Sequence, residues 1–188
     1  SGSLHNYQMK FYEYPLVNKF RAKTPKGFYD KVKGHTGVDF LTPEGVPLTL
    51  PFKALFLGML VQTEMGNTAY LMDEQGNVHV FSHLRDVNKF RGDLVEVGEV
   101  FGFTGNTGSK KTGPHVHYEV IAPQPALNLE IMKRKLWKYE GWNVDPLPFL
   151  TEKKTVSLKK LATQLTAKRA LTDKEFAQFQ LSRKRKKS

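Results

Sequence analysis

The chain has 188 residues, no cysteine and a formal net charge of +11. This length suits one domain with appendages, and the lack of cysteine excludes disulfides and thiolate metal sites. No apolar run is long enough to cross a membrane, and no signal-peptide pattern opens the chain. The opening "SGS" is typical of a cloning remnant, so we expect an export signal or anchor to be missing from this sequence.

The positive charge is concentrated at one end. Residues 151–188 contain 12 Lys/Arg and 3 Asp/Glu, a net +9, whereas residues 1–150 contain 17 and 15, a net +2. A basic tail can contact nucleic acid, anionic lipid or an anionic cell-wall polymer, and a solvated tail without a partner is an equally good interpretation. The nearly neutral body and the lack of a basic-aromatic stripe count against a nucleic-acid binder.

In chain order, residues 1–33 predict extended pieces and loops that pack on the domain following them. From residue 38 to 120, short β-branched and aromatic runs alternate with Gly, Pro and Asn, which is typical of an antiparallel β domain. Within this part, "AYLMDEQGNVHVF" predicts a hairpin with Gly76 and Asn77 at its turn.

The pattern changes after Pro125. "NLEIMKRKLWKY" predicts a short helix, and "GWNVDPLPFL" predicts an extended segment that closes the domain. Residues 155–169 and 172–183 read as amphipathic helices, the second with a capping box. We therefore predict a mainly β fold, with a domain at 34–150 and a basic helical extension at 151–188.

Two histidines stand two residues apart in "TGPHVHYEV". On a strand, alternate side chains share a face, so His115, His117 and Glu119 point one way while Val116 and Tyr118 can pack in a core.

Other histidines occur in two further strand-like segments. In "GHTGVDF", His35 and Asp39 share a face with Gly37, which we expect to leave space for a ligand. In "VHVFSHL", His79 and His83 have the same parity, and we interpret His79 as a rim or structural histidine.

Two imidazoles and one carboxylate are a common ligand set for catalytic zinc, with a fourth position left to water. One isolated histidine is weak evidence for a metal site. The combination of an HxxxD, a strand histidine and an HxH in one β domain is much stronger.

These segments resemble a known family. "HTGVDF", "PEGVPL", "FSHL" and "GEVFGFTGNTGSKKTGPHVHYEV", in this order, resemble the LytM/lysostaphin-type zinc metallopeptidases, which cut peptide bonds in bacterial peptidoglycan. The resemblance runs from about Tyr14 to Leu150. It implies a LytM-like antiparallel β domain with zinc as its cofactor.

Carried over by position, the resemblance implies His35, Asp39 and His117 as zinc ligands. It implies His83 and His115 as catalytic histidines that do not bind the metal. Which of these two acts as the base stays open, and Glu119 is either an acceptor that orients an imidazole or a solvated carboxylate.

The expected function is therefore that of an endopeptidase of the cell envelope, periplasmic or extracellular. It would hydrolyse peptidoglycan cross-links or stem peptides through a metal-activated water. The alternative is a non-catalytic scaffold or activator of cell-wall amidases, and the complete motif set counts against it. Residues 123–145 and the basic tail exceed the family core and bear on substrate choice.

Overall fold

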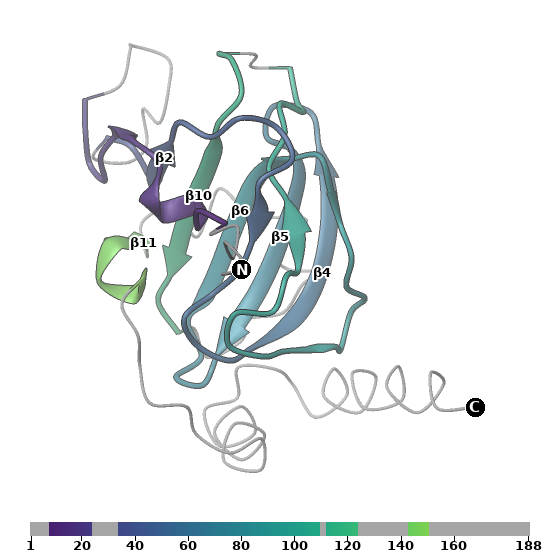
Figure 1. Ribbon diagram of the computed structural model, residues 1–188. Coiled ribbons are helices and arrows are strands. Elements are labelled where there is room, and N and C mark those ends of the chain that lie inside the picture. Colours follow the sequence, from purple (N-terminus) through teal and green to yellow (C-terminus); the bar gives the residue numbers. More distant parts are fainter. Residues whose placement is uncertain (1–7, 24–33, 110–111, 124–142, 151–188) are drawn as a thin grey trace, which may run out of the picture.

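The computed structural model describes residues 8–23, 34–109, 112–123 and 143–150. These residues form two antiparallel β-sheets with two short 3₁₀ turns (Figure 1). The mainly antiparallel β fold expected from the sequence is confirmed. The helices expected within 128–139, 155–169 and 172–183, and with them the basic tail, lie outside the described residues.

The larger sheet has eight strands in the order β1-β2-β10-β6-β5-β4-β8, with β11 paired to β10. Its strands are β1 (Leu16–Asn18), β2 (Val38–Phe40), β4 (Ala54–Gln62), β5 (Gly66–Asp73), β6 (Val78–Leu84), β8 (Leu94–Val95), β10 (Val116–Ile121) and β11 (Asn143–Val144). The smaller sheet consists of β3 (Pro47–Leu48), β7 (Asp86–Val87) and β9 (Gly102–Phe103), with β9 in the middle.

The hairpin between β5 and β6 forms where the sequence predicts it. The carboxylate of Asp73 accepts hydrogen bonds from the backbone N–H of Gln75 and Asn77, at 2.9 and 3.0 Å. Gly76 has φ of +85°, a conformation that side chains with a Cβ rarely adopt. The turn therefore depends on the aspartate as well as on the Gly-Asn pair.

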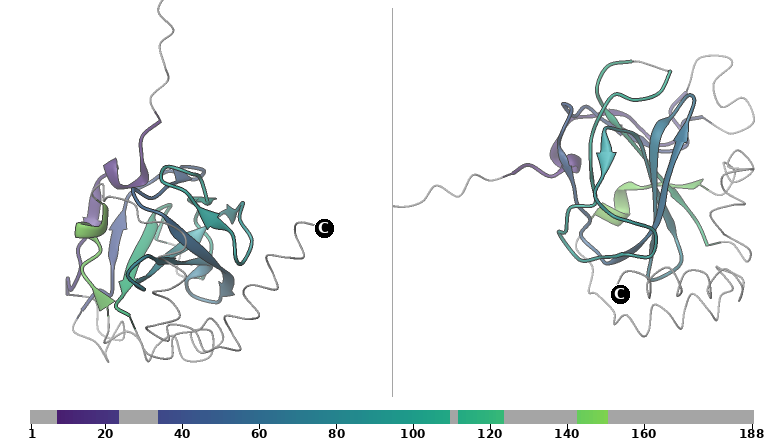
Figure 2. Two further views of the ribbon diagram at one scale, coloured as in Figure 1. Left: turned by 90° about the horizontal axis from the view of Figure 1, so that it is seen from below. Right: turned by 90° about the vertical axis from the view of Figure 1, so that its right-hand side faces the viewer.

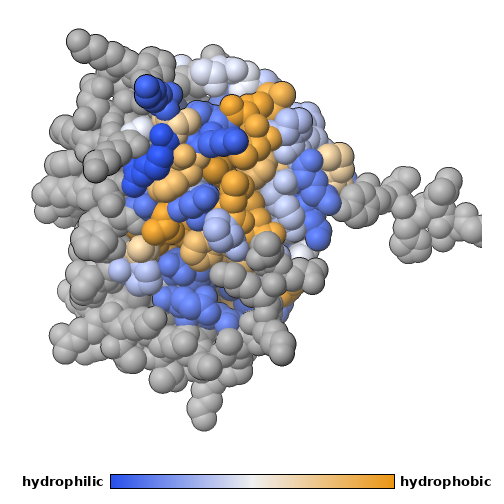
Figure 3. All heavy atoms as spheres, turned by 90° about the vertical axis from the view of Figure 1, so that its left-hand side faces the viewer, coloured by the Kyte–Doolittle hydropathy of each residue, from blue (hydrophilic) through white to orange (hydrophobic). Residues whose placement is uncertain are grey.

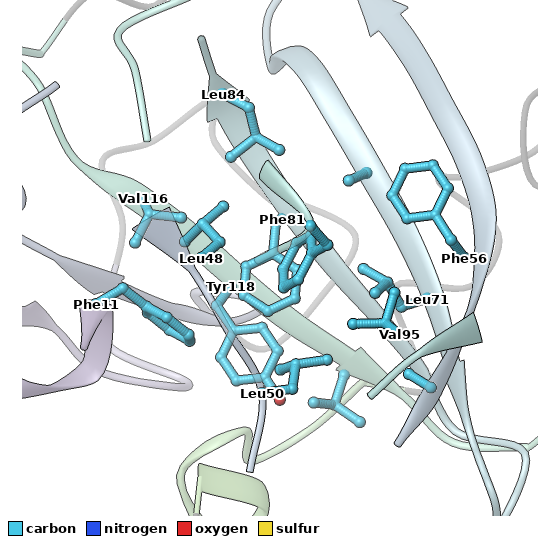
Figure 4. Packing of buried hydrophobic residues seen from close by; sticks show 14 of the residues in the cluster. Phe11, Leu48, Leu50, Phe56, Leu71, Phe81, Leu84, Val95, Val116 and Tyr118 are labelled. Carbon is cyan, nitrogen blue, oxygen red and sulfur yellow. The ribbon is translucent and has the colours of Figure 1, made fainter. Parts of the chain in front are cut away.

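The main core lies between the two sheets, which stand on opposite sides of the body in the right-hand view of Figure 2. Tyr118 of β10 stacks on Phe81 of β6 with ring centroids 4.6 Å apart (Figure 4). Leu48 and Phe101, on and beside strands of the smaller sheet, are fully buried in the same cluster. The predicted core position of Tyr118 is confirmed, and it leaves the opposite face of β10 to polar residues.

The described part of the N-terminal segment joins this body. The 3₁₀ turn η1 (Phe11–Glu13) buries Phe11 edge-on against Phe81, and β1 pairs with β2 at the edge of the larger sheet. Figure 3 shows this side of the molecule, where apolar and hydrophilic side chains are interspersed. The expected domain boundaries at residues 33 and 150 stay a prediction.

The closing segment is only partly extended. β11 pairs with the end of β10, whereas the residues after it form a second 3₁₀ turn, η3 (Leu147–Leu150). Phe149 in this turn packs edge-on against His79 at 5.3 Å. Among the described residues, no helix is long and apolar enough to cross a membrane.

Candidate metal centre

Adjacent strands bring together the three side chains expected to bind a metal. β2 and β10 are antiparallel neighbours, and their register sets His117 directly opposite Asp39. His35 lies in the loop that leads into β2. One ligand atom from each of these three residues lies within 4.8 Å of the other two, so the three side chains converge on one point.

Asp39 is the centre of this cluster. One of its carboxylate oxygens lies 2.7 Å from His117 Nδ1, and the other lies 3.2 Å from His35 Nε2. The Asn18 side chain of β1 also donates a hydrogen bond to this carboxylate, at 3.2 Å. The nitrogens that face Asp39 are therefore the nitrogens available to a shared cation.

The other nitrogen of each imidazole contacts an oxygen outside the cluster. His35 Nδ1 lies 3.2 Å from the carbonyl oxygen of Lys19, and His117 Nε2 lies 2.7 Å from the Glu119 carboxylate. An N–H must donate at each of these positions, because carbonyl and carboxylate oxygens can only accept. His35 Nε2 and His117 Nδ1 are therefore the nitrogens left for a metal, which would replace the proton that His117 Nδ1 donates to Asp39.

Glu119 is half-buried and is held from several directions. The Thr36 hydroxyl donates to the carboxylate oxygen that faces His117, and the Asn143 side chain donates to the other oxygen at 3.2 Å. Of the two interpretations from sequence, the structure favours the orienting acceptor over the solvated carboxylate.

The expectation for Gly37 is wrong. A Cβ at this position would lie 2.2 Å from the carbonyl oxygen of Tyr118 and 2.9 Å from Glu119 Cγ. The glycine therefore admits the neighbouring strand and the Glu119 side chain, and it does not leave space for a ligand.

The charges of this cluster suit a divalent cation. Burial raises the pKa of Asp39, but the hydrogen bonds from His117 and His35 outweigh it and hold this pKa far below its usual range. Burial likewise raises the pKa of Glu119, and its contacts with His117 and Thr36 bring it below the ordinary value. Both carboxylates are thus ionised and face one imidazole from its two sides. Burial lowers the pKa of His117, yet these two carboxylates raise it overall.

His83 and His115 lie together beside the cluster. Their ring centroids are 4.6 Å apart, and His83 is 6.5 Å from the ring of His117. His83 Nδ1 lies 2.9 Å from the Thr107 carbonyl oxygen, and His115 Nδ1 lies 2.9 Å from that of Gly113. Each ring must donate through Nδ1, so in the neutral tautomer the lone pair is on Nε2.

Burial lowers the pKa of His83 to about 4, although its hydrogen bond to Thr107 opposes the shift. The imidazole is therefore neutral near pH 7 and can accept a proton on Nε2.

His79 is separate from this site. It is fully buried in the core, with Nε2 2.9 Å from the Asp73 carboxylate and Nδ1 2.7 Å from the Tyr118 hydroxyl. Of its two interpretations, the structure supports the structural histidine and not the rim position. Its equal parity with His83 does not bring the two histidines to one face, because β6 is irregular before His83.

Sequence reasoning missed four residues whose contacts support the site: Asn18, Thr36, Asn143 and Thr107. Thr36 stands next to a candidate ligand, which is a weak local signal. Asn143 and Thr107 contact site residues that are 24 positions away in the chain, so no local pattern could have identified them.

The family model for "Peptidase family M23" matches residues 33–131, just over half of the chain. Peptidoglycan DD-endopeptidase ShyA of Vibrio cholerae is 31% identical over 122 residues, which are 61% of this chain and 28% of the relative. DD-carboxypeptidase/endopeptidase Mpg of Neisseria meningitidis is 35% identical over 92 residues, 48% of this chain and 21% of the relative. The chain spans about a third or less of the length of such curated relatives.

Solved structures share the fold of this chain. The catalytic domain of lysostaphin from Staphylococcus simulans has the same fold, with a TM-score of 0.60 over 74% of this chain and 94% of that domain, at 24% identity. A zinc containing peptidase from Vibrio cholerae gives a TM-score of 0.51 at 27% identity, over 57% of this chain and 33% of that one. The resemblance to the LytM/lysostaphin-type metallopeptidases is confirmed, and the chain belongs to peptidase family M23.

Proposed function

We propose that this chain is a zinc-dependent endopeptidase that hydrolyses peptide bonds in the cross-links or stem peptides of bacterial peptidoglycan. The observation that carries the proposal is the convergence of His35, Asp39 and His117, whose ligand atoms lie within 4.8 Å of one another. Relatives named as a peptidoglycan DD-endopeptidase and a DD-carboxypeptidase/endopeptidase support the substrate class.

The side chains present fit zinc. Two imidazoles and one carboxylate are a ligand set of catalytic zinc sites, in which a further position stays open. The contacts of His35 with the Lys19 carbonyl and of His117 with Glu119 are of the kind that orient imidazole ligands in metalloenzymes. When bound there, zinc supplies a Lewis acid that polarises a peptide carbonyl and acidifies water.

His83 and His115 are the catalytic histidines of this proposal. Both donate through Nδ1 to a backbone carbonyl, so the neutral form of each carries its lone pair on Nε2. A neutral imidazole can take a proton from attacking water and return it to the leaving amine. Two rings 4.6 Å apart lie close enough together to act on the same peptide bond.

The cell envelope is the location that this substrate requires, and we place the protein there. The basic segment 151–188, with its net charge of +9, is suited to an anionic polymer of the wall. This contact would keep the domain close to its substrate without adding to the chemistry.

Variants of the ligands and of the catalytic histidines test the proposal. His35→Ala and Asp39→Ala should lose zinc and peptidoglycan hydrolysis together, because each removes a ligand. His83→Ala should keep its zinc and lose about 10²–10⁴-fold in turnover, since it removes a proton-transfer group. Zinc content by mass spectrometry and release of soluble wall fragments are measured on the same preparations.

Normal turnover in zinc-loaded His83→Ala would refute the catalytic role of His83. A metal-free His83→Ala protein would instead make this residue a ligand. A wild-type protein that binds zinc but hydrolyses no wall preparation would favour the alternative, a non-catalytic member of the family.

A further inference from the structure

His83 has a backbone conformation that is uncommon for residues other than glycine. Its φ is +63°, in the left-handed region, and Arg21 is the only other non-glycine residue in the described part of the chain with positive φ. This conformation is strained and persists only where surrounding contacts impose it. The conformation therefore needs a structural cause.

The cause is an irregularity between β5 and β6. Asn67 pairs with Leu84 and Ala69 pairs with Phe81, so Ser82 and His83 together stand opposite Thr68 alone. Such a bulge reverses the alternation of side chains that follow it and re-aims a residue.

The bulge decides which face His83 joins. In a regular strand His83 would share the core face with Phe81, whereas Ser82 is paired with His117 on the opposite face. In the bulged strand, His83 instead lies beside His115, with ring centroids 4.6 Å apart. The candidate site therefore contains His83 only because the strand is bulged.

The side chain of Thr107 lies at this bulge. Its hydroxyl accepts a hydrogen bond from the Asn67 N–H at 3.1 Å and donates to the Leu84 carbonyl at 2.7 Å. Asn67 and Leu84 are partners across β5 and β6, so the hydroxyl bridges two backbone groups of a paired position. A side chain from a distant loop thus completes the interrupted ladder.

The backbone of Thr107 holds the imidazole of the same bulge. Its carbonyl oxygen lies 2.9 Å from His83 Nδ1, and the His83 N–H donates to the Met65 carbonyl at 2.8 Å. Thr107 therefore contacts both strands through its hydroxyl and the histidine ring through its carbonyl.

Two glycines let this loop approach so closely. A Cβ on Gly66 would lie 2.4 Å from the carbonyl carbon of Thr107, and a Cβ on Gly108 would lie 2.3 Å from the Glu64 carbonyl oxygen. Both have positive φ, +65° and +101°. The fit of the loop against the β4–β5 turn leaves little freedom for Thr107 to move.

We infer that Thr107 is a positioning residue, whose hydroxyl stabilises the bulge and so keeps His83 in the site with Nδ1 on the Thr107 carbonyl. The catalytic consequence rests on the proposed function, because it takes His83 to be a proton-transfer group. The positioning itself concerns only the geometry of the described residues.

Two substitutions separate the hydroxyl from the bulk of the side chain. Thr107→Val replaces the hydroxyl by a methyl group of similar size, and Thr107→Ser keeps the hydroxyl while losing the methyl. Thr107→Val should lower kcat about 10-fold to 100-fold with little change in KM and unchanged zinc content, the size of effect expected from a misplaced catalytic group. Thr107→Ser should restore kcat to near the wild-type value.

A spectroscopic measurement tests the positioning without activity. In protein labelled with ¹⁵N-histidine, the wild-type and Thr107→Ser forms should show His83 protonated at Nδ1, and Thr107→Val should lose this signature. The His83 signals of the wild type and the two Thr107 variants could follow this expectation while His83→Ala is fully active. The proposed catalytic role of His83 would then fail, and the positioning by Thr107 would stand.

Two results would overturn the inference: an unchanged His83 signal in Thr107→Val, or a Ser variant as impaired as the Val variant. If Thr107→Val does not fold, amide hydrogen exchange in the wild-type protein tests the bridge made by the Thr107 hydroxyl. The Asn67 N–H should be protected by the Thr107 hydroxyl, and rapid exchange at Asn67 would contradict the bridge.

Discussion

At the scale of single residues, four imidazoles of the site share one arrangement. Each places one ring nitrogen against an oxygen outside the site, and in three of the four this oxygen belongs to the backbone, at Lys19, Thr107 and Gly113. The fourth, on His117, belongs to the Glu119 side chain. A backbone carbonyl cannot be removed by a substitution, but a side-chain acceptor can. A substitution at Glu119 therefore tests directly what orients His117.

Replacing this acceptor should weaken zinc binding. In Glu119→Gln one oxygen becomes an NH₂ group, which must face either His117 and Thr36 or the Asn143 amide, and all of these donate hydrogen bonds at present. We expect the zinc affinity to fall about 10-fold to 100-fold, as is typical when the partner of a ligand imidazole is changed. Competition with a chromophoric chelator measures it.

Glu44→Gln is the matched control, because Glu44 is exposed, and it should bind zinc as the wild type does. Equal affinities of the Glu119 variant and this control would show that the carboxylate does not orient His117.

At the scale of strands, alternation explains β10 and fails in β6. Along β10 the sequence correctly separates His117 and Glu119 from the core residue Tyr118, because that strand is regular. Along β6 the same rule joins His79 and His83, but the bulge sends them to opposite faces. No residue in "VHVFSHL" marks this bulge, and the hydroxyl that bridges its two strands comes from a distant loop.

The hairpin of β5 and β6 contains a buried hydrogen-bond network, and its contribution to the free energy of unfolding can be measured. Burial raises the pKa of Asp73, but its bonds to His79 and Asn77 outweigh it and lower this pKa below the usual value. Asp73→Asn should reduce the free energy of unfolding at pH 7 by about 1–3 kcal/mol, because it breaks hydrogen bonds to a buried group. Urea unfolding measures this change.

The pH dependence of this difference has a defined sign. A carboxyl with a lowered pKa in the folded state contributes stability above its unfolded pKa of about 3.9, and this is lost as the pH falls through the folded value. The difference between wild type and variant should therefore be full at pH 7 and smaller near pH 3. Asp86→Asn, at an exposed position, should change stability by less than about 0.5 kcal/mol. If wild type and Asp73→Asn differed in their free energy of unfolding by the same amount at pH 7 and pH 3, an ionised Asp73 would be contradicted.

At the scale of the whole molecule, the two sheets separate stability from chemistry. One face of the larger sheet packs on the smaller sheet and buries the aromatic core, while the opposite face of β2 and β10 carries the proposed ligands. Composition and alternation predict the β class and most of this separation. They do not predict contacts such as that from Asn143 to Glu119, which depend on how distant segments meet.

The same limit applies to the choice of substrate. The family and its named relatives indicate peptidoglycan, but the chain spans a third or less of those relatives. The zinc ligands alone do not determine which bond a peptidase cuts, because selectivity depends on the contacts that a site makes with its substrate. Direct identification of the products is therefore more informative than further comparison.

The most direct test is mass spectrometry of the fragments that the protein releases from purified peptidoglycan sacculi of different cross-link chemistry. We predict soluble fragments with new peptide termini within cross-links or stem peptides, no release with a chelator present, and recovery when zinc is restored. Zinc-loaded wild-type protein that releases no such fragments from any of these sacculi, or equal release by Asp39→Ala, would contradict the account.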